Sequence, residues 1–242
     1  MSQTVKGRAS PVEQIATRQG VRPFHHRGTE ADLGVLRQTF GGIHPQEFAR
    51  RLGQAQQAML AAGKRPLIID AGANIGATAL RFATLYPRAL VVSIEPHPGN
   101  VALLRRNTEG LAVEVMAAAI GPAPGETRIL NPDASEWAFQ TGTDGEGPAL
   151  PVIGVRELIA AKKAEGCAPF IFKCDIEGAE AALFGPDSDW FDEFAMVSVE
   201  IHDWLFPDRP TSPGFLQAHA RTRRALLVAG ENLLSFALPA TP

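Results

Sequence analysis

Residues Pro66-Leu-Ile-Ile-Asp-Ala-Gly-Ala-Asn-Ile-Gly76 form an apolar run that ends in an acidic residue and a glycine-containing turn. A short, continuously apolar run bounded by turn residues is typical of a parallel strand that is covered on both faces. A helical pattern follows from Ala77 to Tyr86, and Pro87 ends it. The stretch therefore predicts the strand, turn and helix that form the repeating unit of an α/β sheet.

The same alternation of strand and helix recurs along most of the chain. We predict further strands over residues 89–95, 112–118, 169–175, 195–201, 225–229 and 233–238, and helices over 98–107, 154–165, 178–184 and 215–224. This spacing indicates an α/β, Rossmann-like fold, in which a mostly parallel, doubly wound sheet carries helices on both faces. Residues 121–151 are rich in Gly, Pro, Asp and Glu, and they predict an irregular insertion over the active-site edge.

The N-terminal quarter of the chain has a different pattern. Residues 1–27 are polar without a hydrophobic period, so we expect a loosely ordered lead-in there. Helical spacing begins after Thr29 with Leu33, Leu36 and Phe40, and a second amphipathic run covers residues 45–62. We therefore predict a lead-in and helical extension over residues 1–62 and a ligand-binding domain over 63–242.

The composition is that of an ordinary globular protein. The chain has 242 residues and a formal net charge of −3, and its basic clusters lie in helical stretches, so a nucleic-acid partner is not expected. Its two cysteines form neither a disulfide framework nor a zinc-ligand pattern. No apolar run reaches about 18 residues, and the start of the chain lacks the apolar core of a secretion signal. We expect a cytoplasmic protein without a membrane span; the sequence leaves open whether it forms a homo-oligomer.

Polar residues at the predicted strand ends indicate the ligand. In an open parallel sheet, ligands bind beyond the carboxyl ends of the strands. Gly72 and Gly76 flank Asn74, so the turn lacks the G-x-G-x-x-G spacing that places a pyrophosphate on a helix N-terminus. Asp70 suits an ammonium group, and Glu95 suits the two hydroxyls of a ribose. An amino group and a ribose together describe S-adenosylmethionine.

The same turn residues allow two interpretations other than S-adenosylmethionine binding. A nicotinamide-dependent oxidoreductase is disfavoured by the missing glycine spacing. Glycines that merely permit a tight turn, in a domain that binds nothing, are the other alternative.

Three stretches resemble the hallmark segments of the FkbM family of methyltransferases. They are residues 69–76, residues 94–100 with Asn107, and Phe172-Lys-Cys-Asp-Ile-Glu-Gly-Ala-Glu180. The similarity runs from about Gly28 through Ser198-Val-Glu-Ile-His202, although residues 121–151 contain no motif that aligns. The resemblance implies a class I methyltransferase fold and methyl transfer to a hydroxyl of a sugar or secondary metabolite, a small-molecule acceptor.

The resemblance also implies which residues hold the cofactor. Residues 63–242 are then an S-adenosylmethionine-binding methyltransferase domain, and the ribose acid falls on Glu95. Ala118 or Ala119 borders the adenine, where a small side chain leaves room for the ring. The full implied cofactor set is Asp70, Gly72, Asn74, Gly76, Glu95, Ala118 and Ala119.

Asp175, Glu200 and His202 are the candidate catalytic residues, because they lie at or near the ends of two strands that face the transferred methyl group. Glu200 and His202 share one face of a strand by its period of two. His202 is the predicted general base, since its unperturbed pKa lies near neutrality, and Asp175 is the fallback. The alternative for His202 is a strand-end histidine that merely bonds to Glu200.

Lys173 and Glu180 are expected to have structural roles. An unpaired charge on a central strand is costly, so Lys173 is expected to pair with a nearby carboxylate. Glu180 is expected to be a first-turn acid that complements a helix dipole.

A divalent metal is possible at the catalytic residues, but the sequence does not favour one. Asp175, Glu177, Glu200 and His202 offer suitable ligand atoms, yet no spacing among them requires a cation. A catalytically inactive S-adenosylmethionine-binding protein is the remaining alternative, and the presence of His202 and Asp175 argues against it.

Overall fold

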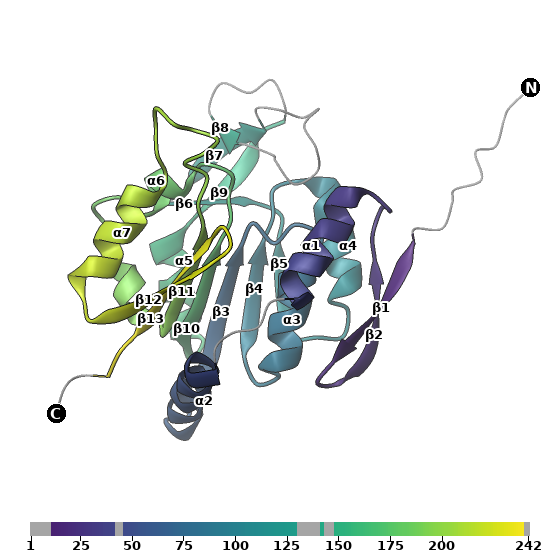
Figure 1. Cartoon of the computed structure of the whole chain (residues 1–242), viewed down its shortest axis with the longest axis horizontal. Helices are drawn as coiled ribbons and strands as arrows, with labels where there is room; N and C mark the ends of the chain where they lie inside the picture. Colours follow the sequence, from purple (N-terminus) through teal and green to yellow (C-terminus); the bar gives the residue numbers. More distant parts are fainter. Residues whose placement is uncertain (1–10, 42–45, 130–140, 143–147, 240–242) are drawn as a thin grey trace, which may run out of the picture.

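The computed structural model describes residues 11–41, 46–129, 141–142 and 148–239. Its main sheet has seven strands in the order β12-β13-β11-β10-β3-β4-β5 (Figure 1). These strands are β3 (Arg65–Ala71), β4 (Leu90–Ile94), β5 (Val113–Met116), β10 (Cys167–Cys174), β11 (Met196–Glu200), β12 (Arg224–Ala229) and β13 (Asn232–Ala237).

The sheet is mostly parallel and doubly wound, as the sequence predicts. Strands β5, β4, β3, β10 and β11 pair in parallel, while β13 lies antiparallel between β11 and β12. The chain winds outward from β3 to β5 and then returns to the other side of β3 at β10. The order of the strands therefore reverses between β3 and β10, which is where such folds bind ligands.

Helices cover both faces of this sheet. One face carries α2 (Gln46–Ala61), α3 (Ala77–Leu85) and α4 (Pro98–Asn107); the other carries α5 (Val155–Ala164), α6 (Glu180–Leu183), the 3₁₀ helix η1 (Asp189–Glu193) and α7 (Ser212–Arg221). Along β3, Ile68 belongs to the cluster that contains Leu52 of α2, and Ile69 to the cluster that contains Leu158 of α5. Successive side chains of β3 thus enter opposite cores, which explains why its sequence is continuously apolar.

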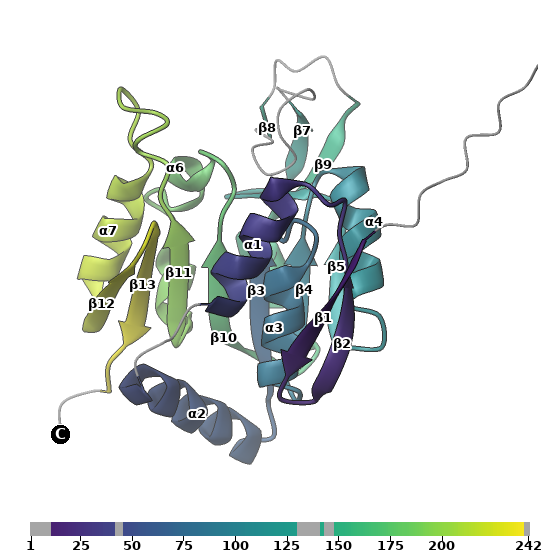
Figure 2. The same cartoon turned by 45° about the vertical axis from the view of Figure 1, so that its right-hand side comes forward.

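The N-terminal region differs from its prediction. Residues 12–25 form an antiparallel hairpin of β1 (Val12–Thr17) and β2 (Gly20–His25) beside α3 and α4 (Figure 2), whereas residues 1–10 lie outside the described part. Phe24 is fully buried in a cluster with Ile75 and Leu80, so contacts distant in sequence order this segment.

The two predicted N-terminal helices are present but integrated into the fold. Helix α1 (Glu30–Gly41) packs on α3, and α2 packs against β3 and β10. A helical extension separate from the sheet is therefore not evident, and the domain division at residue 62 stays a prediction. Within the described residues, no helix combines the length and the apolar character needed to cross a bilayer.

The predicted irregular insertion contains regular structure. It forms a second sheet in the order β6-β9-β7-β8, from β6 (Ala119–Gly121), β7 (Gly125–Ile129), β8 (Thr141–Gly142) and β9 (Leu150–Gly154). This sheet stands above the main sheet in Figure 1. The sequence predicts one isolated strand-like stretch in this insertion, residues 127–130, and it falls on β7 up to Ile129; the prediction of irregular structure was wrong for β8 and β9. Residues 130–140 and 143–147 lie outside the described part.

Candidate active site

The turn after β3 has a backbone that requires its glycines. Gly72, Asn74 and Gly76 have φ values of 75°, 49° and 91°, in the left-handed region. A Cβ added to Gly72 would lie 1.7 Å from the backbone oxygen of Asp175, and one added to Gly76 would lie 2.7 Å from Cδ1 of Leu104. The turn therefore touches the end of β10 on one side and α4 on the other. Asn74 can occupy the middle of this turn because asparagine tolerates the left-handed region better than most non-glycine residues.

Glu95, directly after β4, is held by the same turn. Its side chain is 5% exposed; Oε2 accepts a hydrogen bond from the Asn74 amide at 2.9 Å, and Oε1 accepts bonds from the His97 amide at 2.9 Å and Asn100 Nδ2 at 3.1 Å. Burial raises the pKa of Glu95, and these hydrogen bonds oppose the rise. The carboxylate is thus fixed in one orientation.

Most of the residues predicted to bind the cofactor line one cavity. Gly72, Asn74, Glu95, Ala118 and Ala119 all lie on its wall, although they come from three separate connections after strands. The cavity also reaches Asp175. Asn74 presents a second useful group, because its buried Oδ1 has no hydrogen-bond partner among the described residues.

Asp70 and Gly76 do not line this cavity. Gly76 is buried against Leu104, where it allows α3 and α4 to approach each other. Asp70 is fully buried, and its Oδ1 lies 3.5 Å from Lys173 Nζ. Burial raises the pKa of Asp70 to about 6, while the charge of Lys173 opposes the rise. The geometry does not fit the predicted direct contact between Asp70 and a cofactor ammonium.

Lys173 connects the turn to the end of β10. Its Nζ donates a 2.7 Å hydrogen bond to the Gly72 carbonyl and lies 3.3 Å from Asp175 Oδ2. The predicted pairing of Lys173 with a carboxylate is therefore present, with both Asp175 and Asp70. Asp70 is thus linked to the turn through this ammonium.

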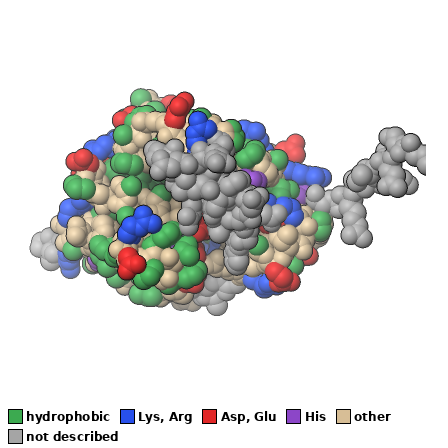
Figure 3. All heavy atoms as spheres, turned by 90° about the horizontal axis from the view of Figure 1, so that it is seen from above, with side chains coloured by type: hydrophobic (Ala, Val, Ile, Leu, Met, Phe, Trp, Pro, Cys, Tyr) green, Lys and Arg blue, Asp and Glu red, His purple; other side chains and the backbone are tan. Residues whose placement is uncertain are grey.

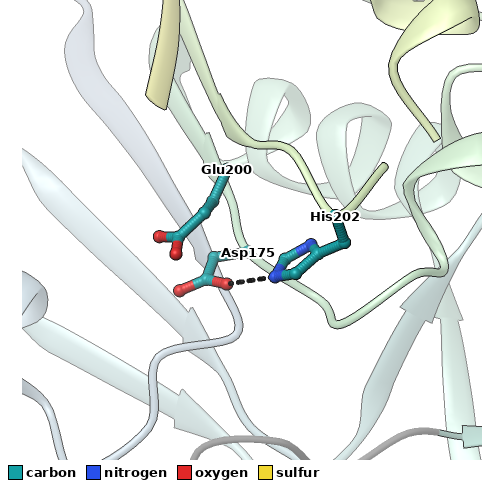
Figure 4. Close-up of side chains that lie close together, drawn as sticks. All are labelled: Asp175, Glu200 and His202. Atoms are coloured by element: carbon teal, nitrogen blue, oxygen red, sulfur yellow. Dashed lines mark ion pairs between the residues drawn. The ribbon is translucent and has the colours of Figure 1, made fainter. Parts of the chain in front are cut away.

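Asp175, Glu200 and His202 lie together at the carboxyl ends of β10 and β11 (Figure 4). One side-chain atom from each lies within 4.8 Å of the others, and His202 Nε2 is 3.9 Å from Asp175 Oδ1. His202 stands beyond the last residue of β11, so its position results from the loop that follows the strand. The sequence correctly predicted that these three residues come together.

Glu180 fixes the ring of His202. Glu180 is fully buried at the start of α6. Its Oε1 accepts a hydrogen bond from the Ile176 amide at 3.1 Å, and its Oε2 accepts one from the Gly178 amide at 2.9 Å. His202 Nδ1 lies 3.0 Å from the same Oε1. The predicted first-turn position is correct. No local pattern predicts the contact between Glu180 and His202, because the two residues are 22 positions apart and belong to different parts of the fold.

Comparison with known families accounts for this arrangement. A model of the methyltransferase FkbM domain matches residues 70–231, about two thirds of the chain. The chain belongs to the FkbM methyltransferase family. Its Rossmann-like sheet is accordingly a class I methyltransferase fold, and the match includes every predicted site residue, from Asp70 to His202.

Solved structures similar to this FkbM domain are remote. Monomeric WbdD is 13% identical with a TM-score of 0.44, covering 81% of this chain and 42% of that one. An O-methyltransferase from Bacillus cereus in complex with SAH is 14% identical with a TM-score of 0.42, covering 85% and 88%. A precorrin-6y C5,15-methyltransferase from Geobacter metallireducens is 11% identical with a TM-score of 0.39, covering 81% and 91%. A search of curated proteins found no match. Because the identities and TM-scores are this low, we infer nothing about the ligands of the FkbM domain from these structures.

Electrostatics distinguish the catalytic candidates of this FkbM domain. Desolvation lowers the pKa of His202, but the hydrogen bond and charge of Glu180, followed by the charges of Glu177 and Asp175, raise it to about 9. Burial, and then the charge of Asp175, raise the pKa of Glu200 to about 7. At neutral pH His202 is therefore protonated, which does not fit its predicted role as general base, whereas Glu200 is poised to accept a proton.

Glu177, which the sequence grouped with Asp175, Glu200 and His202 but did not count among the catalytic candidates, lies beside the same three residues. Its Oε2 lies 3.4 Å from His202 Nε2, and burial followed by the charge of Asp175 raises its pKa to about 8. Its φ of 54° is in the left-handed region, and a Cβ on the neighbouring Gly178 would lie 2.4 Å from the ring of Phe206. Such strain in a non-glycine residue is common at functional sites. Glu177 lies on the wall of the cavity that Glu95 and Ala118 also line, and it does so in a costly backbone conformation.

Proposed function

We propose that this FkbM domain is an S-adenosylmethionine-dependent O-methyltransferase that acts on a hydroxyl of a small-molecule acceptor. One observation carries the proposal. The cavity lined by Glu95 and Ala118 meets a second cavity, lined by Glu200, and both are lined by Gly72, Asn74 and Asp175. A donor in the first cavity and an acceptor in the second would meet at these shared residues.

The described residues fit the donor. Glu95 is oriented to accept hydrogen bonds from ribose hydroxyls, and the two alanines at 118 and 119 leave room for an adenine. The buried Oδ1 of Asn74 suits an ammonium donor, which assigns to Asn74 the contact predicted for Asp70. When bound, S-adenosylmethionine supplies a sulfonium methyl group, which the acceptor oxygen takes as the carbon–sulfur bond breaks and its electron pair stays on sulfur.

Glu200 is the proposed base. It lines the acceptor side of the junction, next to Asp175, and its pKa of about 7 allows it to take the hydroxyl proton near neutral pH. Protonated His202, held by Glu180, places a positive charge beside Asp175 and Glu177. This charge limits the repulsion that the acids of the cluster exert on an ionised Glu200.

A divalent cation is not required in this mechanism. Asp175, Glu200 and His202 are close enough to ligate one. However, the Lys173 ammonium lies 3.3 Å from Asp175 and already places a positive charge there.

A small acceptor also agrees with the surface. On the face seen from above in Figure 3, the described Lys and Arg side chains are interspersed with Asp and Glu rather than gathered into a basic patch. Nucleic-acid binding normally needs such a patch. A cytoplasmic location remains a prediction from the sequence.

Two measurements test the proposal. Calorimetric titration with S-adenosylmethionine and with NAD should give binding of the former alone; binding of NAD alone would indicate an oxidoreductase. Transfer of a tritiated methyl group is then assayed against extracts of the source cells, separated by chromatography. Binding without transfer to any fraction would favour an inactive binding protein.

A further inference from the structure

The second cavity extends from the catalytic cluster along the face of the sheet that α2 and α3 cover. It has a volume of about 230 Å³ and is lined by residues of α1, α3 and the strands β10, β11 and β13. The exposed Gln38 of α1 lies on its wall, so the cavity opens to solvent on that side. It adjoins the proposed cofactor site, because Gly72, Asn74 and Asp175 line both.

The polar groups of this cavity are distributed unevenly. Lys173, Asp175 and Glu200 gather at the carboxyl ends of the strands, where the two cavities meet. The sheet floor and the opposite wall are dominated by apolar side chains, among them Leu52, Phe82, Tyr86, Met196 and Leu234. The remaining polar wall residues come from α1, α3 and the sheet: Gln38, Thr39, Thr78, Arg81, Ser198 and Asn232.

We propose that the acceptor is an alcohol with an apolar body, which lies along the α2 and α3 face of the sheet and presents one hydroxyl to Asp175 and Glu200. The inference rests on the proposed methyl transfer, since it names the acceptor class for that site. Burying a hydroxyl that finds no hydrogen-bond partner is unfavourable. A polyol such as a sugar would therefore be penalised against Leu52, Phe82 and Met196, whereas a hydrocarbon body gains free energy there.

The first test measures how binding depends on the length of the apolar body. Primary alcohols from 1-hexanol to 1-decanol, and methyl α-glucoside, are titrated into the protein with and without S-adenosylhomocysteine. Each added methylene should tighten binding by about fourfold until the cavity is full, and the glucoside should bind more weakly than any alcohol. Affinity that does not change with chain length, or tighter binding of the glucoside, would overturn the inference.

A matched pair of variants locates the binding. Thr39→Trp places an indole on the cavity wall from α1, whereas Arg37→Trp places the same ring on the exposed side of that helix. Thr39→Trp should weaken decanol binding at least tenfold relative to Arg37→Trp, with both variants checked by thermal unfolding. Equal affinities would show that the alcohol binds elsewhere and overturn the inference.

The titrations with S-adenosylhomocysteine distinguish a failure of this inference from a failure of the proposed function. Alcohol binding in the predicted pattern, without any binding of S-adenosylhomocysteine, would refute the proposed function while supporting the apolar site. Binding of S-adenosylhomocysteine without the chain-length dependence would leave methyl transfer standing and refute the apolar acceptor.

Discussion

Replacing Glu180 by glutamine should lower the pKa of His202 substantially. Glutamine keeps the shape of this fully buried side chain, but its one carbonyl oxygen can accept only one of the amides of Ile176 and Gly178, which bond to different oxygens of Glu180. It removes the negative charge that lies 3.0 Å from His202 Nδ1. The variant therefore tests whether the charge of Glu180, rather than the position of the ring, keeps His202 protonated.

The expected magnitude follows from the pKa of His202. A rise from 6.5 to about 9 is worth about 3 kcal/mol, at about 1.4 kcal/mol for each pH unit. Desolvation opposes this rise, and Glu180 is the largest single contributor to it, ahead of Glu177 and Asp175. We expect the pKa of His202 to fall by about one pH unit or more in Glu180→Gln.

The same change has a consequence for stability with a definite sign. Because the folded-state pKa of His202 is raised, its contribution to stability is present below pH 6.5 and is lost as the pH rises through about 9. The difference in free energy of unfolding between the wild type and Glu180→Gln should therefore be largest near pH 6 and should narrow by about pH 10.

The assay is a titration of the imidazole ring nitrogens by ¹⁵N NMR, with the six histidines distinguished by comparison with His202→Gln. Chemical denaturation near pH 6 and pH 10 gives the stability difference. Glu193→Gln, a charge removal at a surface ion pair with Lys163, serves as the control and should leave both quantities unchanged. A pKa of His202 within half a unit of the wild type, in a folded Glu180→Gln protein, would refute the reasoning.

Three further predictions concern binding and catalysis. Glu95→Ala should weaken S-adenosylmethionine binding by about 1.5 to 3 kcal/mol, the scale of a hydrogen bond to a charged group; unchanged affinity by calorimetry in a folded variant would exclude the ribose contact. Glu200→Gln should slow methyl transfer about 100- to 10,000-fold without weakening cofactor binding, and should remove the increase in rate that the wild type shows as the pH rises through about 7. If His202→Ala slows methyl transfer more than Glu200→Gln does, His202 is the general base instead. Dialysis against EDTA should leave turnover intact, and a loss that magnesium or manganese restores would place a cation at Asp175.

The sequence alone determined the framework of this protein. The strands ending at Asp70, Glu95 and Asp175 are short apolar runs, and the strand carrying Glu200 has the same character, so their position in a covered parallel sheet can be predicted from local pattern. Because the carboxyl ends of parallel strands meet at one edge, the same pattern predicted that acids on separate strands would converge. The family resemblance rests on these same segments.

Other parts of the fold could not be predicted because their order depends on partners distant in sequence. The hairpin over residues 12–25 lacks a strong apolar period, and it is held by the burial of Phe24 against Ile75 and Leu80. The strands after Ala118 pair across the insertion, and their glycine- and proline-rich sequence conceals them.

The chemical roles within the site were decided by the tertiary structure. The sequence placed Asp70 and His202 at the site but assigned roles from their unperturbed chemistry. Asp70 is fully buried beside Lys173, outside the cavity that the other predicted cofactor residues line, and Glu180, 22 residues from His202, raises the pKa of the predicted base. Proton affinity depends on desolvation and on the charges within a few ångströms. Those neighbours are set by how the loops after β10 and β11 fold against each other, which no local pattern records.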